Sequence, residues 1–208
     1  TGTFGDFAVF SFHSHKNITT LGEGGMLVIN NNKFDDNLIK MIRHNAHTKF
    51  NFKRKSYWLP AMNNLDTPKL NGKILMPNNF CISEVQCALG SLLLKRVNEI
   101  NKKKRNRALK FIDMLKDYKQ IKFLRVDSER NNYHLLVASI EKNEKFTRDD
   151  FIRIMANKYK IQCIVQYYPL HKYDFYKKIL INNEKIVNTE IFFDRMVSFP
   201  FSSHLSDK

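Results

Sequence analysis

The chain has 208 residues, of which 43% are apolar, enough for a sizeable hydrophobic core and two lobes. Its 35 basic and 20 acidic residues give a formal charge of +15, which raises the hypothesis of a basic nucleic-acid-binding module. Those charges are spread through a chain rich in Asn, Ile and Phe, however, and a basic surface also suits anionic small substrates such as nucleotide diphosphates. Because the basic charge is scattered, nucleic acid is not expected as a partner. No apolar run approaches membrane-spanning length, so a membrane is not expected either.

Two strands and a helix are predicted in the first 45 residues. The apolar runs FAVFSF at 7–12 and GGMLVIN at 24–30 are typical of strands. Apolar residues recur at helical spacing over 34–43. Residues 46–78 carry three prolines and several asparagines, which predicts a long irregular loop of functional or interface type.

The rest of the chain alternates helical and strand patterns. Ser83 is a good N-cap for one long helical pattern that runs to about residue 118. After it we predict a strand at 133–140, a helix at 148–159, a strand at 161–168 and a helix near 172–180. This order predicts an α/β protein with two domains, residues 1–117 and 118–208. The first residues read TGTFGDF, without an initiator methionine, and we expect a chain truncated at both ends.

Cysteine and histidine spacing predicts no bound metal. Cys81, Cys87 and Cys163 form no CxxC pair or disulfide framework, which fits buried thiols in a reducing cytosol. His13 and His15 form an HxH pair, but no third ligand stands at a suitable spacing.

The segment SFHSHKNITTLGEGG at 11–25 contains the candidate catalytic group. A lysine amine becomes a useful nucleophile or base when partial burial lowers its pKa, and Lys16 lies between a strand and a turn, where burial is plausible. Ser11 offers a hydroxyl, and the glycines that follow allow a ligand to approach the backbone. The segment is not a P-loop, because the lysine precedes the glycines. On these grounds alone, a glycine turn between two strands and a phosphate site are equally good interpretations.

The same segment resembles the signature of the DegT/DnrJ/StrS sugar aminotransferases, which are pyridoxal phosphate (PLP) enzymes of the aspartate-aminotransferase fold, fold type I. The family pattern G-D-x-x-x-F-S-F-H-x-x-K-x-I-T-T is matched by GDFAVFSFHSHKNITT, and only Leu21 is inserted before GEGG. The resemblance implies that Lys16 binds PLP covalently and that Ser11 hydrogen-bonds its phosphate. His15 is a candidate for the sugar pocket, with a solvent-facing role equally open.

The resemblance continues to the end of the chain. PNNFCISEVQCALG at 77–90 is similar to a family segment whose asparagine, here Asn79, reaches the PLP phosphate of the other subunit of a homodimer. VQYYPLHKY at 165–173 resembles the family's V-H-Y-x-P-L-H segment, which implies nucleotide-sugar contacts for Tyr167 and His171. Gln166 replaces the family's first histidine and weakens the match there. The resemblance therefore implies the rear part of the large PLP domain followed by a small C-terminal α/β lobe.

The resemblance implies a cytoplasmic aminotransferase of polysaccharide or deoxyamino-sugar biosynthesis. It would move an amino group from an amino acid, with glutamate the expected donor, to a nucleotide-linked keto-deoxysugar. Two alternatives stay open: a related deoxysugar dehydratase, whose family members carry histidine in place of the lysine, and an inactive fragment or basic binding module. The family's E-D-x-A-Q segment, whose aspartate protonates the pyridine nitrogen, is absent from the sequence. This chain alone is therefore expected to be inactive.

Overall fold

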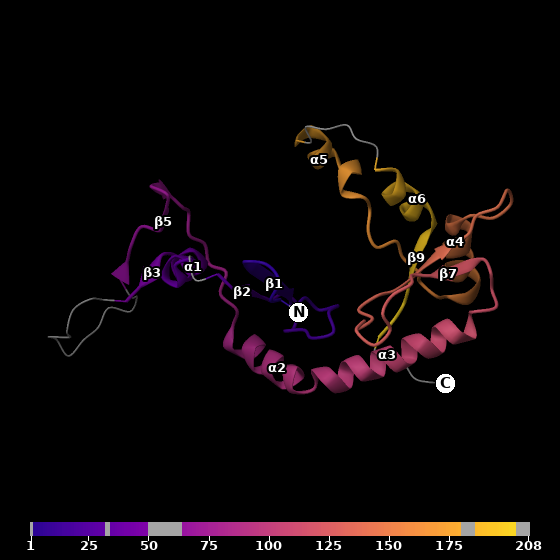
Figure 1. Cartoon of the computed structure of the whole chain (residues 1–208), viewed down its shortest axis with the longest axis horizontal. Coiled ribbons are helices and arrows are strands. Elements are labelled where there is room, and N and C mark those ends of the chain that lie inside the picture. Colours follow the sequence, from indigo (N-terminus) through magenta and orange to yellow (C-terminus); the bar gives the residue numbers. More distant parts are fainter. Residues whose placement is uncertain (1, 32–33, 50–63, 180–185, 203–208) are drawn as a thin grey trace. The chain divides into compact units, whose positions relative to one another are not determined.

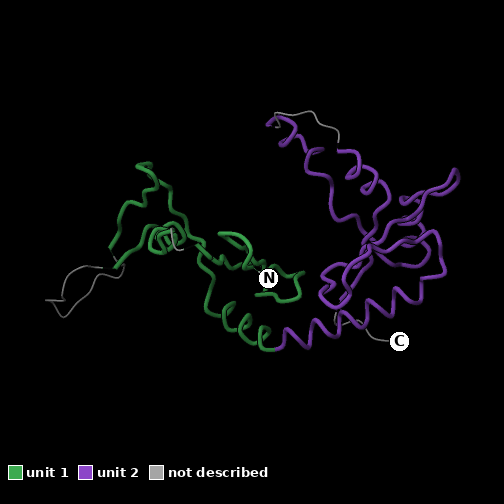
Figure 2. Tube along the Cα trace, in the orientation of Figure 1, with its two compact units in different colours: residues 1–95 green, residues 96–208 purple. Residues whose placement is uncertain are grey.

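The structure is a computed structural model, and it describes residues 2–31, 34–49, 64–179 and 186–202. The chain divides into two compact units, residues 1–95 and 96–208, which are coloured separately in Figure 2. The sequence instead places the domain boundary after residue 117, so the two divisions differ by the length of one helix. Each unit is described separately below.

The first unit is built around a two-stranded antiparallel hairpin (Figure 1). Strand β1, Phe7–Ser11, pairs with strand β2, Gly25–Ile29, in a register that sets Ser11 opposite Gly25. Both strands were expected from their apolar runs. The short pairs that follow are β3, His47–Thr48, with β4, Asn64–Leu65, and β5, Lys69–Leu70, with β6, Lys73–Ile74.

Two capped helices complete the first unit. Helix α1, Asp36–Arg43, begins at Asp35, whose carboxylate accepts the N–H of Asn37 at 2.8 Å. Helix α2, Glu84–Lys95, begins after Ser83, whose hydroxyl and N–H both donate to the Gln86 side chain. Among the described residues of this unit, three are buried: Thr20, Ala46 and Pro68. The unit therefore has very little core of its own.

The long helix predicted from Ser83 is in fact two helices. Helix α2 ends at Lys95, and helix α3, Val97–Met114, begins after Arg96, whose ψ of 4° interrupts the helical path. No glycine or proline marks this break, which coincides with the division between the units. Within the predicted irregular segment 46–78, residues 50–63 lie outside the described residues, and the described remainder holds β3 to β6.

The second unit has a three-stranded antiparallel sheet in the order β7–β8–β9. Its strands are β7, Ile121–Phe123, β8, Leu136–Ile140, and β9, Met196–Phe199. Alternate residues of β8 are buried, and they form a core with residues of α3, β9 and the loops: Ala108, Tyr133, Leu136, Ala138, Ile140, Cys163, Val197 and Phe199. This unit therefore buries a contiguous hydrophobic cluster.

Three α-helices and a short 3-10 helix follow or flank this sheet. Helix α4, Arg148–Tyr159, has the bounds expected from the sequence and begins with a capping box between Thr147 and Asp150. Helices α5, Asp174–Ile179, and α6, Val187–Arg195, follow the 3-10 turn Leu170–Lys172. The strand predicted at 161–168 is wrong: this segment meets the free edge of β9 through one isolated bridge, Ile164 with Ser198, and the pairing does not extend into a strand.

Candidate functional site

The lysine loop, residues 12–24, joins β1 to β2 and folds back on itself. At its base the N–H of Phe12 donates to the carbonyl of Gly24 at 2.7 Å, and the N–H of Thr20 donates back to the carbonyl of Phe12 at 3.0 Å. A tight turn holds the lysine, because the N–H of Lys16 donates to the carbonyl of His13 at 2.9 Å. The Lys16 side chain is half-buried. The loop backbone is therefore fixed on both sides of the amine.

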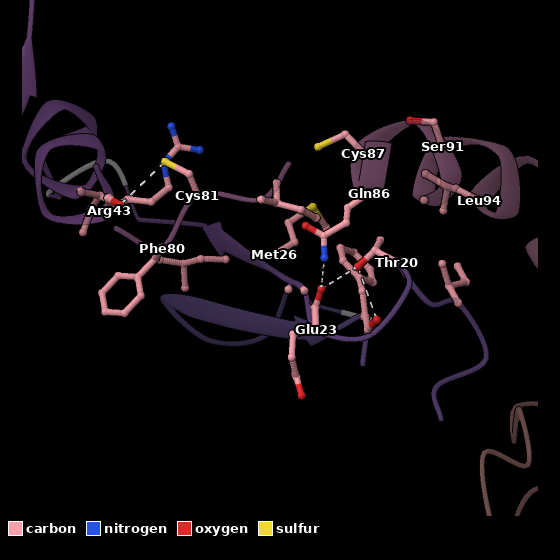
Figure 3. A pocket seen from close by; sticks show the side chains of 18 of the residues that line it. Thr20, Glu23, Met26, Arg43, Phe80, Cys81, Gln86, Cys87, Ser91 and Leu94 are labelled. Atoms are coloured by element: carbon pink, nitrogen blue, oxygen red, sulfur yellow. Dashed lines mark hydrogen bonds between the residues drawn. The ribbon is translucent and has the colours of Figure 1, made fainter. Parts of the chain in front are cut away.

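Close packing around Thr20 fixes the second half of this loop (Figure 3). Thr20 is 1% exposed, and its hydroxyl donates to the carbonyl of Glu23 at 3.1 Å. A Cβ atom on Gly24 would lie 2.2 Å from the Thr20 Oγ1, and one on Gly90 would lie 3.0 Å from its Cγ2. The Gln86 side chain ties α2 to the loop by donating to the Glu23 carbonyl at 2.7 Å. Glycine is thus required at position 24 because any side chain there would collide with Thr20.

Ser11 and two histidines lie at the start of the loop. The hydroxyl oxygen of Ser11 accepts the N–H of His13 at 3.4 Å, so it retains its own hydrogen for donation to another acceptor. The His13 Nε2 lies 3.6 Å from the Glu23 carboxylate, and its ring meets that of His15 edge-on at 5.1 Å between centroids. His13 is therefore held inside the loop structure, and His15 is exposed.

The donor groups of the lysine loop fit pyridoxal phosphate. Lys16 supplies the primary amine that an aldehyde requires, and Ser11 supplies an exposed hydroxyl five residues earlier. Thr19 adds an unassigned donor, because its Oγ1 is buried and has no hydrogen-bond partner among the described residues. A buried hydroxyl without a partner is costly, which favours an acceptor supplied by a ligand. Thr19 was not predicted as a site residue from the sequence, because only the structure shows that its hydroxyl is buried without a partner among the described residues.

Asn79 lies on the segment that precedes α2. Its side-chain oxygen accepts the N–H of Cys81 at 3.2 Å, and its backbone forms a bridge with His44, at the end of α1. The exposed amide group therefore belongs to a local turn, a geometry typical of asparagine. The ring of His44 stacks on that of His47 at 4.4 Å between centroids.

Tyr167 and His171 lie in the second unit, on a segment that we call the substrate loop, residues 165–173. Tyr167 is 64% exposed, whereas the His171 side chain is 19% exposed and lies on the 3-10 turn Leu170–Lys172. The Nε2 of His171 lies 3.1 Å from a carboxylate oxygen of Glu190 on α6. The structure thus places His15 and Lys16 on the lysine loop, Ser11 at the end of the strand that enters it, and Tyr167 and His171 on the substrate loop.

A cavity of 820 Å³ in the first unit was not predicted from the sequence. It lies between β2, α1 and α2, and Met26, Arg43, Phe80 and Cys87 are among the side chains drawn around it in Figure 3. None of the predicted site residues is among the described residues that line it. The one sequence feature that bears on this cavity is the helical spacing of apolar residues in α1 and α2, which indicates the two helices but not a cavity between them.

One lysine of the second unit has a strongly perturbed pKa. Lys104 is 5% exposed, and burial lowers the pKa of its amine from 10.5 to about 8. The amine donates to the carbonyl of His134 at 3.2 Å and lies 5.2 Å from the centroid of the Phe201 ring. It is held by core contacts of α3, so we treat it as structural.

Metal and membrane sites are the remaining possibilities. Across the described ranges, no three His, Cys, Asp or Glu side chains gather in a way that could hold a metal ion. In the same part of the chain, no helix combines the length and apolar character needed to cross a membrane.

Comparisons with known proteins show the family of the chain. The model of the DegT/DnrJ/EryC1/StrS aminotransferase family matches residues 1–208. The chain is 28% identical over 214 residues to the spore coat polysaccharide biosynthesis protein SpsC of Bacillus subtilis, covering 99% of the chain and 51% of SpsC. It is 27% identical over 211 residues to the UDP-4-amino-4,6-dideoxy-N-acetyl-beta-L-altrosamine transaminase of Campylobacter jejuni, covering 100% of the chain and 50% of that enzyme.

A solved structure gives the same result for the fold. PseC of Helicobacter pylori, an aminotransferase involved in the biosynthesis of pseudoaminic acid, matches with a TM-score of 0.79 at 26% identity, covering 100% of this chain and 51% of PseC. The predicted α/β fold of the aspartate-aminotransferase type is confirmed by this likeness. The chain spans about half the length of the curated relatives it matches.

Proposed function

The chain belongs to the DegT/DnrJ/EryC1/StrS aminotransferase family, and from that premise we propose that the whole protein transfers an amino group from glutamate to a nucleotide-linked keto-deoxysugar. One observation supports this most directly: the lysine loop fixes the Lys16 backbone in a turn and carries the buried Thr19 hydroxyl, and Ser11 ends the strand that enters the loop. An amine for the aldehyde and hydroxyl donors for the phosphate are the groups that pyridoxal phosphate requires.

Pyridoxal phosphate, which solved relatives carry in PLP and PMP forms, supplies an electron sink for the carbanion that transamination requires. Lys16 would hold it through its amine, and Ser11 and Thr19 would donate hydrogen bonds to its phosphate. In the first half of the reaction the Nζ of Lys16 would be the base that takes the proton from the donor Cα. In the second half it would be the acid that delivers a proton to the sugar carbon that receives the nitrogen, so Lys16 would serve as both base and acid.

The substrate residues that we propose lie on the substrate loop and the lysine loop. Tyr167 is exposed and available for a sugar or nucleotide contact, and His15 is exposed beside the amine. The formal charge of +15 favours attraction of an anionic diphosphate.

The assembly that we propose is a homodimer in the cytoplasm. An exposed Asn79 amide suits a contact with the partner's cofactor phosphate, and the free thiols of Cys81 and Cys87 suit a reducing compartment. Sedimentation of the whole protein tests the dimer, and cofactor retention in Asn79→Asp tests the contact of Asn79 with the partner's cofactor. We expect a dimer in both cases, with weaker cofactor retention in the variant.

The test of the function is a pair of Lys16 variants in the whole protein. Lys16→Ala and Lys16→Arg should both abolish the visible absorbance of the lysine-bound cofactor and amino transfer from glutamate to a UDP-linked 4-keto-6-deoxysugar. Lys40→Ala, which removes an exposed lysine of α1, serves as the control and should retain both signals. Undiminished turnover in Lys16→Ala would overturn the aminotransferase assignment and reopen the dehydratase alternative, which the presence of Lys16 opposes.

A further inference from the structure

The end of the substrate loop rests on one face of helix α6. Glu190 and Phe193 stand three residues apart on that helix and therefore share a face. The Tyr168 ring meets Phe193 edge-on at 5.4 Å, and the Nζ of Lys172 lies 5.3 Å from the centroid of the same ring. The Glu190 carboxylate lies 3.1 Å from the Nε2 of His171 and 4.0 Å from the Nζ of Lys172. The Glu190 carboxylate and the Phe193 ring thus hold three residues of the substrate loop: Tyr168, His171 and Lys172.

The segment just before the loop has a separate anchor. Ile164 exchanges two backbone hydrogen bonds with Ser198 of β9, at 3.1 and 2.7 Å. Pro169, in the middle of the loop, is buried. Between the Ile164 anchor and this proline, the Tyr167 side chain stands 64% exposed. Its position therefore depends on the anchors at both ends and not on regular secondary structure of its own.

The contact with Glu190 changes the role expected for His171. An imidazole nitrogen that lies 3.1 Å from a carboxylate donates its hydrogen there, so the Nε2 of His171 is already engaged. The ring is 19% exposed, and Glu190 of α6 holds its orientation. His171 is thus suited to holding the loop, while Tyr167 is suited to meeting the substrate.

We propose that Glu190 is a positioning residue of the substrate loop, which acts through His171 to present Tyr167 to the nucleotide sugar. The proposal rests on the proposed function for the identity of that substrate. An isolated exposed ion pair contributes little. Glu190 differs because its partner His171 is largely buried and because Lys172 meets the same carboxylate, so losing Glu190 releases the end of the loop rather than one side chain.

The experiment compares Glu190→Ala with Glu190→Gln in the whole protein. Glu190→Ala removes a charge-assisted hydrogen bond, and we expect the KM for the nucleotide sugar to rise about tenfold with kcat within about twofold. Glu190→Gln keeps an oxygen that accepts from Nε2, so the rise should be about threefold. Glu99→Ala is the matched control, because Glu99 pairs with Lys103 at 2.8 Å on its own helix α3, and it should leave both constants unchanged.

Two further measurements separate this proposal from the proposed function. The donor half of the reaction, with glutamate alone, should proceed at the wild-type rate in every Glu190 variant. The ¹⁵N resonances of the His171 ring should show hydrogen on Nε2 in the wild type and a change in Glu190→Ala. A wild-type protein inactive in both halves would overturn the proposed function and the substrate role of the loop together. Normal activity in the wild type with an unchanged sugar KM in Glu190→Ala would overturn the positioning role alone.

Discussion

Burial of Lys104 should make the stability of the second unit rise steeply with pH. The pKa of its amine is about 8 in the folded chain, against 10.5 when unfolded. Between those two values the unfolded chain binds more protons, so the free energy of unfolding increases as pH rises through this window. At roughly 1.4 kcal/mol for each pH unit, the full effect between pH 7 and pH 11 is about 3 kcal/mol. Below pH 8 the buried charge opposes folding, and the hydrogen bond to His134 offsets part of this.

The perturbation is Lys104→Met, which keeps an unbranched side chain only one atom shorter and removes the titrating amine. The wild type should gain about 3 kcal/mol more stability than this variant between pH 7 and pH 11. Lys103→Met is the control, because the neighbouring amine is exposed and pairs with Glu99 on the surface of the same helix. It should follow the wild type at every pH.

Cys163 provides a local probe for this measurement. Its thiol is buried in the core of the second unit and becomes reactive only on unfolding, whereas Cys81 and Cys87 are exposed and report the intrinsic labelling rate at each pH. Short pulses of a thiol reagent across a urea series, read by mass spectrometry, give the free energy of unfolding of that unit. If the wild type and Lys104→Met showed parallel pH dependence, burial would not be lowering the pKa of Lys104.

Two further substitutions test contacts seen in the two units. Arg148→Met should lower the free energy of unfolding of the second unit by about 3 kcal/mol, since the buried guanidinium donates to the carbonyls of Phe193 and Met196, both at 2.9 Å. Labelling of Cys163 measures this free energy. A loss under about 0.5 kcal/mol would contradict the stabilising role of Arg148. Gly24→Ala should reduce cofactor retention by the whole protein, because its Cβ would lie 2.2 Å from the Thr20 Oγ1. Adding Thr20→Ala should restore part of it, and full retention in the single variant would show that the loop adapts.

Local sequence signals predicted the elements whose structure is set locally. Helix α4 has its expected bounds because Thr147 and Asp150 form a capping box at its start. The strand expected at 161–168 failed for the opposite reason. Its apolar residues fit a strand, but its partner is β9, about thirty residues later in the chain, and the two pair only at Ile164 and Ser198. Propensity cannot decide how far a segment pairs along the edge of a sheet.

The same distinction applies to the candidate site. Ser11 and Lys16 are five residues apart at the end of one strand, so their spacing could be read directly from the sequence. The pairing of His171 with Glu190 spans nineteen residues and joins a 3-10 turn to α6, and no periodicity predicts it. Sequence similarity therefore implied a substrate contact for His171, which stays a prediction, and it gave no sign that the Nε2 of His171 contacts Glu190.

This difference in how the two loops are held implies a difference in how they fail. The lysine loop lies in a unit with three buried residues among those described, so its geometry depends on short backbone contacts such as that between Phe12 and Gly24. The substrate loop belongs to the second unit, which has a contiguous core, and side chains of α6 fix it. A substitution that disrupts the lysine loop should displace the Lys16 amine and therefore abolish both halves of the reaction. Damage to the Glu190 contact should leave the donor half intact and weaken only the use of the sugar, because Glu190 acts through His171 of the substrate loop, whereas the lysine loop supplies the amine.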